Sequence, residues 1–480
     1  MSKRAAQKKL VLAVIDGLTP AALERGLEER RLPALGLLHE AGTYRCGTTT
    51  FPSVTPVCLT SIATGAHPDV HGVPHLVWYH RSEERVIEYG SSFAAVRAAG
   101  TRRSMRDSIF GLTHEHLSRE AVTVFEALED EGFGAAAINF TCYRGRTRHA
   151  LKLPVPIGRN RWYEAAWGPR RFFFFNLYES DETGAGLAIR SRPEGSIDAY
   201  AATIGRWLVT RDGFDFLVFY LPDFDYASHL AGPEGAFAAL ERADASLGEL
   251  MAAAGGPEEF LDRYAIVVCS DHGQTRVERV ARLQAAFDDL VVFTGRRGDD
   301  PRGADVAVTA SNRSGMVYAL DGRPARSLAE RLDGFPGADL VLFREDAEAV
   351  MRREGEEARF APEGDGWRVA GDEGIADPAQ YPNAFERAWC ALACPNAGDV
   401  IVSAAAGWEF EDLGRRHHGG GGSHGSLLAG DSTIPVIASG LEPDVDLPDA
   451  PSITDLAPLA LAHFGVEPAA SMRGRVQSGV

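Results

Sequence analysis

The chain has 480 residues, 45% of them hydrophobic and 24% charged, which is an ordinary composition for a globular protein. The length exceeds that of a usual single domain, so we expect one large domain with insertions, or a large and a small domain. The formal net charge of -18 disfavours nucleic acid polymers and anionic membranes as partners. It does not disfavour a small phosphorylated substrate, because bound cations can reverse the field inside a site.

The N-terminus is basic and then apolar, a pattern that superficially resembles a signal peptide. The apolar run 10–15 is too short for one, and Asp16 interrupts it, so a first buried strand is the better prediction. No apolar stretch in the sequence is long enough to span a bilayer. We therefore expect a cytoplasmic protein, and the sequence leaves its oligomeric state open.

Short apolar runs alternate with helical stretches along the chain. The runs have the length and composition of buried parallel strands. This alternation predicts an α/β fold, a doubly wound and mostly parallel sheet with helices on both faces. In chain order the elements are strand 10–15, helix 21–39, helix 121–131, strand 214–220, helix 236–254 and strand 264–269.

A segment of different composition, rich in Arg, Asp, Glu and Gly, extends from 279 to 380. It contains strand-like runs at 315–320 and 338–343, with a helical stretch at 325–332 between them. We predict a small inserted α+β domain over 279–380, with 1–278 and 381–480 forming the core. The apolar run 172–178 is predicted to be a further strand or an apolar wall.

Acidic residues follow each of the three predicted strands. Asp16 follows the first strand, Asp223 and Asp225 the second, and Asp271 the third. A single Asp after a strand is more often a helix N-cap. Ligands bind beyond the carboxyl ends of the strands in such sheets, so these carboxylates together should gather on one rim.

Histidines accompany these carboxylates. His229 comes four residues after Asp225, His272 follows Asp271, and His424 lies in the glycine-rich loop 417–426. Each pattern alone is weak, since a histidine in a glycine loop is more often simply solvated. Three carboxylates and three imidazoles together suit two Zn²⁺-like ions. His417 and His418 lie in the same loop. They are candidates for a substrate contact, but we favour the interpretation that they have no functional role.

A hydroxyl group completes the predicted site. Thr55 precedes Pro56 and an apolar helical stretch at 57–63, which predicts a helix N-cap at Thr55. A capping threonine is the plain alternative. The start of a helix also favours anions, including an alkoxide and the phosphate that it attacks.

As a set, these motifs resemble those of the alkaline phosphatase superfamily, in particular its type I phosphodiesterase/nucleotide pyrophosphatase branch. The motifs are VIDG, SVTP with ATGAHPDVHG, D-x-x-x-H-x-x-G-P, SDHG and GSHG. The resemblance covers 10–72, 214–274 and 419–465. It implies an alkaline phosphatase-like fold and a hydrolase of phosphate esters that forms a covalent phospho-threonine on Thr55.

The resemblance also implies two metal shells. One consists of Asp16, Thr55, Asp271 and His272, and the other of Asp225, His229 and His424. We expect two divalent ions, Zn²⁺ in the first place and Mn²⁺ as the alternative.

At two motif positions the resemblance could be assigned to either of two residues. Asp223 competes with Asp225, but the spacing of four to the histidine, followed by Gly-Pro, favours Asp225. Thr50 competes with Thr55 because a Phe-Pro follows it, but the distance to the ATG at 63–65 favours Thr55.

One departure concerns the substrate. Nucleotide-cleaving members carry an Asn shortly after the motif that here ends at His71-Gly72, and this Asn holds a phosphoryl oxygen. The present chain reads VPHL at 73–76 instead. His75 is predicted as a substitute donor, with Asp223 as a second candidate for substrate binding, and the departure weakens a specific claim to nucleotides.

We therefore expect a phosphodiesterase or pyrophosphatase that acts on a small phosphorylated compound. A phosphomonoesterase or a phosphotransferase with the same site is the first alternative. A non-catalytic metal-binding protein is the second, and the intact ligand set argues against it.

Overall fold

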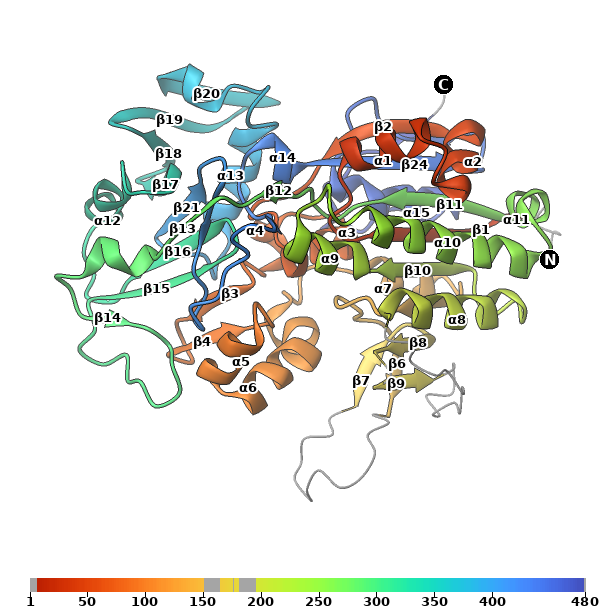
Figure 1. Cartoon of the computed structure of the whole chain (residues 1–480), viewed down its shortest axis with the longest axis horizontal. Helices are drawn as coiled ribbons and strands as arrows, with labels where there is room; N and C mark the ends of the chain where they lie inside the picture. The colour runs from red at the N-terminus through yellow and green to blue at the C-terminus, as the bar shows by residue number, and fades with distance from the viewer. Residues whose placement is uncertain (1–6, 151–164, 176, 181–195, 479–480) are drawn as a thin grey trace.

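Two eight-stranded sheets, side by side in Figure 1, organise the chain. The computed structural model describes residues 7–150, 165–175, 177–180 and 196–478. In spatial order the first sheet contains β2 (Thr43–Thr48), β24 (Thr433–Ser439), β11 (Tyr264–Cys269), β1 (Lys9–Ile15), β10 (Phe216–Leu221), β5 (Ala135–Ile138), β8 (Arg171–Phe174) and β9 (Tyr178–Ser180).

The centre of the first sheet is parallel. Strand β1 pairs in parallel with β10 and with β11, and the parallel order continues through β5 to β8. The outer strands β24, β2 and β9 pair antiparallel. The three strands predicted from apolar runs are therefore neighbours in a mostly parallel sheet, as expected, although β10 begins at Phe216.

Helices cover both faces of this sheet. Leu10, Leu12 and Val14 of β1 belong to one hydrophobic cluster, and the alternating residues Val11 and Ala13 belong to another. The first cluster includes α3 (Thr55–Thr64), α7 (Val124–Asp130) and α15 (Leu456–His463). The second includes α1 (Pro20–Glu28), α2 (Pro33–Ala41), α8 (Ile197–Val209) and α10 (Phe237–Ala254). The sheet is thus doubly wound.

The predicted helix over 21–39 is wrong in one respect, because the structure has two helices there, α1 and α2. Leu32 lies between them outside the helical region, with φ -122° and ψ 73°. Pro33 lacks an amide hydrogen and restricts the residue before it, so a helix cannot continue through this point. The helices predicted at 121–131 and 236–254 correspond to α7 and α10.

The second sheet is mostly antiparallel. Its strands are β14 (Val292–Phe293), β15 (Val306–Ser311), β16 (Ser314–Ala319), β21 (Val400–Ala404), β17 (Ala338–Glu345), β18 (Glu348–Arg353), β19 (Glu356–Glu363) and β20 (Gly366–Gly371). Only β21 comes from outside the predicted insertion 279–380. Helix α12 (Ala325–Leu332) lies where it was predicted. The division of the chain into domains stays a prediction.

The loops after β1, β10 and β11 converge at one edge of the first sheet, next to the turn between β15 and β16 of the second. Strand β10 leads through Pro222 into α9 (Asp223–Ala231). The apolar run 172–178 forms β8 and the start of β9, while residue 176 is outside the described residues. None of the described helices has both the length and the apolar character needed to cross a membrane.

Candidate metal centre

Three buried carboxylates meet at this edge. Asp16 follows β1, Asp271 follows β11, and Asp225 lies in the first turn of α9. The close approach requires a glycine after Asp16. Gly17 has a φ of +70°, and a Cβ there would lie 3.0 Å from Gln274 Nε2 and 3.1 Å from Asp225 Oδ1.

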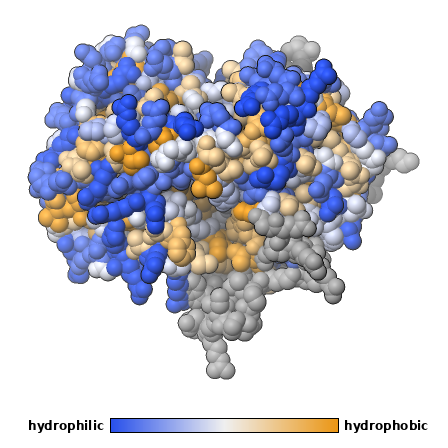
Figure 2. Space-filling model, in the orientation of Figure 1, coloured by the Kyte–Doolittle hydropathy of each residue, from blue (hydrophilic) through white to orange (hydrophobic). Residues whose placement is uncertain are grey.

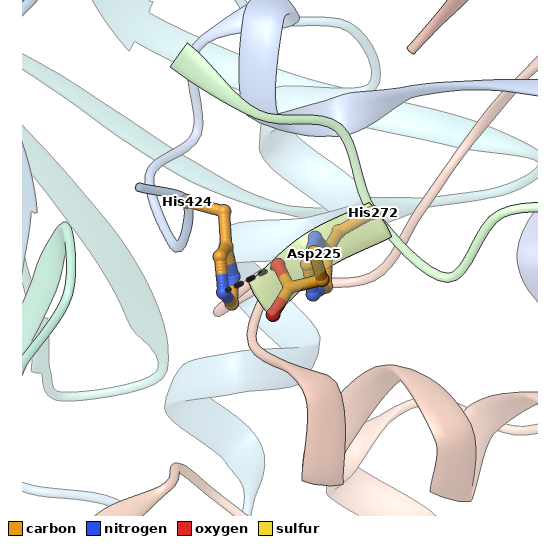
Figure 3. Close-up of side chains that lie close together, drawn as sticks. All are labelled: Asp225, His272 and His424. Carbon is orange, nitrogen blue, oxygen red and sulfur yellow. Dashed lines mark ion pairs between the residues drawn. The ribbon is translucent and has the colours of Figure 1, made fainter. Parts of the chain in front are cut away.

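Two groups of side chains could each hold a metal ion. One group is Asp16, Asp271 and His272, and the other is Asp225, His272 and His424, which Figure 3 shows. Within each group the ligand atoms lie within 4.8 Å of one another. The His272 and His424 rings are stacked, with their centroids 3.6 Å apart. The structure therefore contains two adjacent buried candidate sites that share His272.

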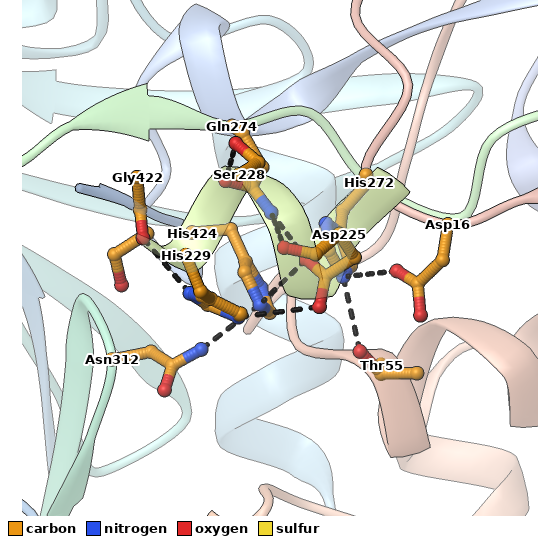
Figure 4. Close-up of polar contacts among 12 residues, drawn as sticks. Asp16, Thr55, Asp225, Ser228, His229, His272, Gln274, Asn312, Gly422 and His424 are labelled. Carbon is orange, nitrogen blue, oxygen red and sulfur yellow. Dashed lines mark hydrogen bonds and ion pairs between the residues drawn. The ribbon is translucent and has the colours of Figure 1, made fainter. Parts of the chain in front are cut away.

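His229 lies beside the second group, one helical turn after Asp225. Its Nε2 is 3.3 Å from Asp225 Oδ2. Compared with the implied shells, the structure differs by placing His272 in both groups. It nevertheless brings together all the side chains proposed as ligands, most of which Figure 4 shows: Asp16, Thr55, Asp225, His229, Asp271, His272 and His424.

The three histidines present the same ring nitrogen to the centre. Each Nδ1 contacts a backbone carbonyl oxygen, at 2.8 Å to Gly422 for His229, 2.9 Å to Gly273 for His272 and 2.8 Å to Ser53 for His424. A carbonyl only accepts hydrogen bonds, so each Nδ1 carries the proton. The Nε2 lone pairs are left for metal ions, the usual arrangement of metal-binding histidines.

The electrostatics fit a divalent cation. Burial, together with the charges of Asp271 and Asp225, raises the pKa of Asp16 well above its usual value. Burial also raises the pKa of Asp271. Asp16 Oδ1 and Asp271 Oδ2 are buried oxygens without a hydrogen-bond partner among the described residues. A buried carboxylate oxygen is costly to leave in this state, and a bound cation would stabilise both.

Asp225 has the opposite balance. Burial raises its pKa, but the positive charge of the neighbouring histidines when they are protonated, His229 first and then His424 and His272, outweighs burial and holds the pKa below its usual value. Asp225 is therefore the carboxylate that ionises most readily in this cluster.

Thr55 faces the centre, but not as the cap of its helix. Val54 occupies the cap position and Thr55 is the first residue of α3, so the prediction was one residue off. No side-chain capping bond forms there. Thr55 Oγ1 instead lies 3.1 Å from His272 Nε2. The rival Thr50 is fully buried, and its Oγ1 lies 2.9 Å from His67 Nδ1.

The two predicted substrate-binding residues do not line the cavity next to this centre. His75 is fully buried, with its Nε2 2.8 Å from Ser314 Oγ. Asp223 caps the start of α8, where it accepts a hydrogen bond of 2.5 Å from Ser196 Oγ. Direct substrate contacts by His75 and Asp223 are thus not supported, because both side chains bond within the protein.

The cavity has a volume of about 700 Å³. Thr55 and four of the candidate ligands line part of it, namely Asp16, Asp225, His229 and His424, and most of the remaining lining is apolar. None of the described residues that line it is a lysine or an arginine. Figure 2 shows a hollow near the centre of one face, with hydrophobic residues at its lower margin. The apolar wall includes Leu76, Ile109, Leu112, Phe174, Phe175 and Leu177.

Two further side chains line the cavity. Asn312 was not identified from the sequence, and no role was favoured for His418. His418 stacks on His229 at 3.9 Å between centroids, and its Nδ1 lies 2.6 Å from Glu409 Oε1. Its position in the glycine-rich loop that also carries His424 was the sequence feature that could have indicated a role for His418. Asn312, in the turn between β15 and β16, has its Nδ2 2.9 Å from His424 Nε2. No sequence motif surrounds it.

Fold and site define the class of protein. The arrangement is an alkaline phosphatase-like fold with two candidate buried metal sites at the ends of its parallel strands. The profile of the family "Type I phosphodiesterase / nucleotide pyrophosphatase" matches residues 10–427. The chain therefore belongs to this family of hydrolases, as its motifs predicted.

Solved structures of similar fold include two enzymes. Phosphonoacetate hydrolase from Sinorhizobium meliloti 1021, in complex with phosphonoformate, has 20% identity and a TM-score of 0.57, with 95% of this chain and 96% of that chain covered. Murine ectonucleotide pyrophosphatase/phosphodiesterase 5 has 15% identity and a TM-score of 0.60, with 98% of each chain covered. Its inactive variant in complex with AMP has a TM-score of 0.61 at 14% identity, again with 98% of each chain covered. A comparison with curated proteins finds no match.

Proposed function

We propose that the chain is a metal-dependent phosphodiesterase or pyrophosphatase of small organic phosphates, with Thr55 as its nucleophile. The observation that carries the proposal is the position of Thr55 Oγ1, 3.1 Å from His272 Nε2 and beside both candidate metal groups. Family membership supports the hydrolase class, and the cavity supplies room for a substrate.

The ligand set suits two ions. Asp16, Thr55, Asp271 and His272 would hold one ion, and Asp225, His229 and His424 the other. Mixed carboxylate and imidazole ligands favour Zn²⁺, with Mn²⁺ as the second choice. Such ions, when bound, neutralise charge on the phosphoryl group and lower the pKa of a coordinated hydroxyl.

The chain's own groups then perform the reaction. Thr55 Oγ1 gives its proton to solvent and attacks phosphorus in line. The ester bond breaks as the bond to Thr55 forms, and the leaving oxygen departs with the electron pair and takes up a proton from water. The positive end of the α3 dipole and the backbone N–H of Thr55 favour the anionic phosphoryl group. Pro56 has no N–H, and the N–H groups of Val57 and Cys58 donate to Val54 O. Water hydrolyses the resulting phospho-threonine and restores Thr55.

The cavity favours a substrate with a phosphate at one end and an apolar or aromatic group at the other. The apolar wall continues to Tyr226 and Leu230, which are 53% and 86% exposed at the rim. Such exposed hydrophobic side chains suit contact with an organic group. The compounds bound in the similar structures, phosphonoformate and AMP, are small phosphorus compounds, which supports this size class.

The test compares Thr55→Ala with Thr50→Ala on bis(p-nitrophenyl) phosphate and p-nitrophenyl phosphate. We expect the wild type to prefer the diester and Thr55→Ala to lose turnover while its metal content stays unchanged. Thr50→Ala is the matched control and should keep its turnover. Its stability should be lower, because loss of the Thr50 hydroxyl leaves His67 Nδ1 without its hydrogen-bond partner. Wild-type turnover by Thr55→Ala would disprove the nucleophile, and preference for the monoester would favour the phosphomonoesterase alternative.

A further inference from the structure

We propose that Asn312 donates an amide hydrogen to a non-bridging oxygen of the substrate's phosphoryl group. The second sheet would thereby supply the donor that the sequence after His71-Gly72 lacks. The inference rests on the proposed function and adds a substrate-binding residue to it. The juxtaposition that carries it is the Asn312 amide against the metal-facing nitrogen of His424, inside the cavity that Thr55 lines (Figure 4).

The hydrogen bonds determine which way the amide points. His424 Nδ1 donates to the Ser53 carbonyl oxygen at 2.8 Å, so the Nε2 of the neutral ring is an acceptor. Asn312 Nδ2 therefore donates to that nitrogen, at 2.9 Å. The other end of the amide, Oδ1, accepts from Ser311 Oγ at 3.0 Å. An N–H donor consequently faces the cavity.

This donor shares its acceptor with the proposed metal ion. A His424 Nε2 that holds a cation has no lone pair left for Asn312. Asn312 is only 5% exposed, and a buried donor without a partner is costly. An oxygen of a phosphoryl group bound at the same centre is the acceptor that the cavity would offer. Substrate binding would thus satisfy the donor that metal binding releases.

The turn that carries Asn312 is held from several sides. The backbone N–H of Phe410 donates to Asn312 O at 2.9 Å, and that of Arg313 donates to His424 O at 2.8 Å. The fully buried Arg313 guanidinium forms an ion pair with Asp431 at 2.6 Å. A donor fixed before the reaction stabilises developing charge without reorganisation, which is the most effective form of such stabilisation.

His75 contributes to this support. Its Nε2 bonds Ser314 Oγ, at the start of β16 and two residues beyond Asn312. The residue predicted to replace the missing Asn as a donor thus holds the turn that presents Asn312. Asn312 itself has a φ of +56°, a conformation that Asn adopts more readily than most other residues.

The experiment uses the metal-loaded enzyme and its variants Asn312→Ala and Asn312→Asp. The matched control is Asn383→Ala, because Asn383 has a similar φ of +51° but is exposed and does not line the cavity. Three quantities are measured: kcat/KM for bis(p-nitrophenyl) phosphate, metal content, and the calorimetric affinity for orthovanadate, a mimic of the pentacoordinate phosphoryl group.

We expect Asn312→Ala to lower kcat/KM by about 10²-fold, the usual effect of removing one such donor, with metal content unchanged. Orthovanadate affinity should fall at least tenfold, and Asn312→Asp should lower both quantities further through charge repulsion. Asn383→Ala should match the wild type.

Orthovanadate affinity within threefold of the wild type in Asn312→Ala would overturn the inference. So would a loss of metal that parallels the loss of activity, since Asn312 would then act by holding His424. The two proposals can fail separately. If the wild type hydrolyses neither ester, but Asn312→Ala binds orthovanadate more weakly than the wild type does, the proposed function is disproved and the Asn312 contact remains supported.

Discussion

The centre is built from carboxylates that use one oxygen for the protein and leave the other free. Asp16 Oδ2 accepts from the Tyr220 hydroxyl, and Asp271 Oδ1 accepts from the backbone N–H groups of Gly17 at 3.2 Å and His272 at 3.0 Å. Asp16 Oδ1 and Asp271 Oδ2 have no such partner among the described residues. Neighbouring groups thus fix each carboxylate in orientation while one oxygen remains for a cation.

At the scale of single residues, we predict that the Tyr220 hydroxyl supports metal binding by Asp16. Its hydrogen bond lowers the pKa of Asp16, against the burial and the two carboxylates that raise it. In Tyr220→Phe the Asp16 pKa rises further, so protons compete more strongly with the metal, most of all at low pH. We expect metal affinity to fall by about 10- to 100-fold.

Competition with a chromogenic chelator measures this affinity. Tyr226→Phe is the control, because Tyr226 lies at the exposed rim of the cavity and should bind metal as the wild type does. Equal affinities in Tyr220→Phe and the wild type would show that the hydroxyl does not support Asp16.

At the scale of elements, the residues that flank the hairpin of β3 (Val77–His80) and β4 (Arg85–Glu88) line the cavity, Leu76 before it and Tyr89, Gly90 and Ser91 after it. The fully buried Glu88 side chain accepts from the backbone N–H groups of Gly90 at 2.8 Å and Ser91 at 2.6 Å. Burial raises the pKa of Glu88 from 4.5 to about 7, despite these hydrogen bonds.

This pKa makes the stability of the fold depend on pH. The folded state holds the Glu88 proton more tightly than the unfolded state does. The stabilisation of the fold by protonated Glu88 is therefore complete below pH 4.5 and is lost as the pH rises through about 7. The shift corresponds to about 3 kcal/mol at most. Glu88→Gln, which retains the acceptor oxygen, should lose less free energy of unfolding between pH 5 and 8 than the wild type. Parallel urea-denaturation profiles for the two proteins across this range would contradict the assignment.

The main sheet was predictable because its central parallel strands are buried on both faces, which makes them continuous apolar runs. The carboxylates after those runs were predictable for the same reason. Pro33 was a local signal that the prediction over 21–39 failed to use. Asn312 is different, since it meets His424 across 112 residues of sequence through the packing of two sheets, and no local pattern encodes that contact. His75 likewise owes its position to Ser314 on the second sheet.

At the scale of the whole molecule, the centre joins the two sheets. Asp16, Asp225 and Asp271 lie in segments that follow strands of the first sheet, and Asn312 and Arg313 lie in the turn between two strands of the second. The loop that carries His424 lies between them, and the buried Arg313–Asp431 ion pair fixes the junction. Metal binding should therefore stabilise the complete fold. The expected cytoplasmic location stays a prediction.

Metal removal tests this coupling. A chelator should abolish diester hydrolysis and lower the Tm, and added Zn²⁺ or Mn²⁺ should restore both. At a metal concentration of 100 Kd the expected stabilisation is about 2.7 kcal/mol. Calorimetry on Asp225→Ala, which lacks a ligand, should show a smaller shift of the Tm. Full activity after exhaustive chelation, or an equal shift in Asp225→Ala, would contradict the metal assignment.

The stereochemistry at phosphorus tests the central claim most directly. A phosphorothioate diester of known configuration is hydrolysed in ¹⁸O-labelled water, and the configuration of the product is determined. Each in-line displacement inverts the phosphorus centre. Attack by Thr55 followed by attack by water therefore predicts net retention. Net inversion would show that water attacks the diester directly, and it would contradict a phospho-threonine intermediate on Thr55.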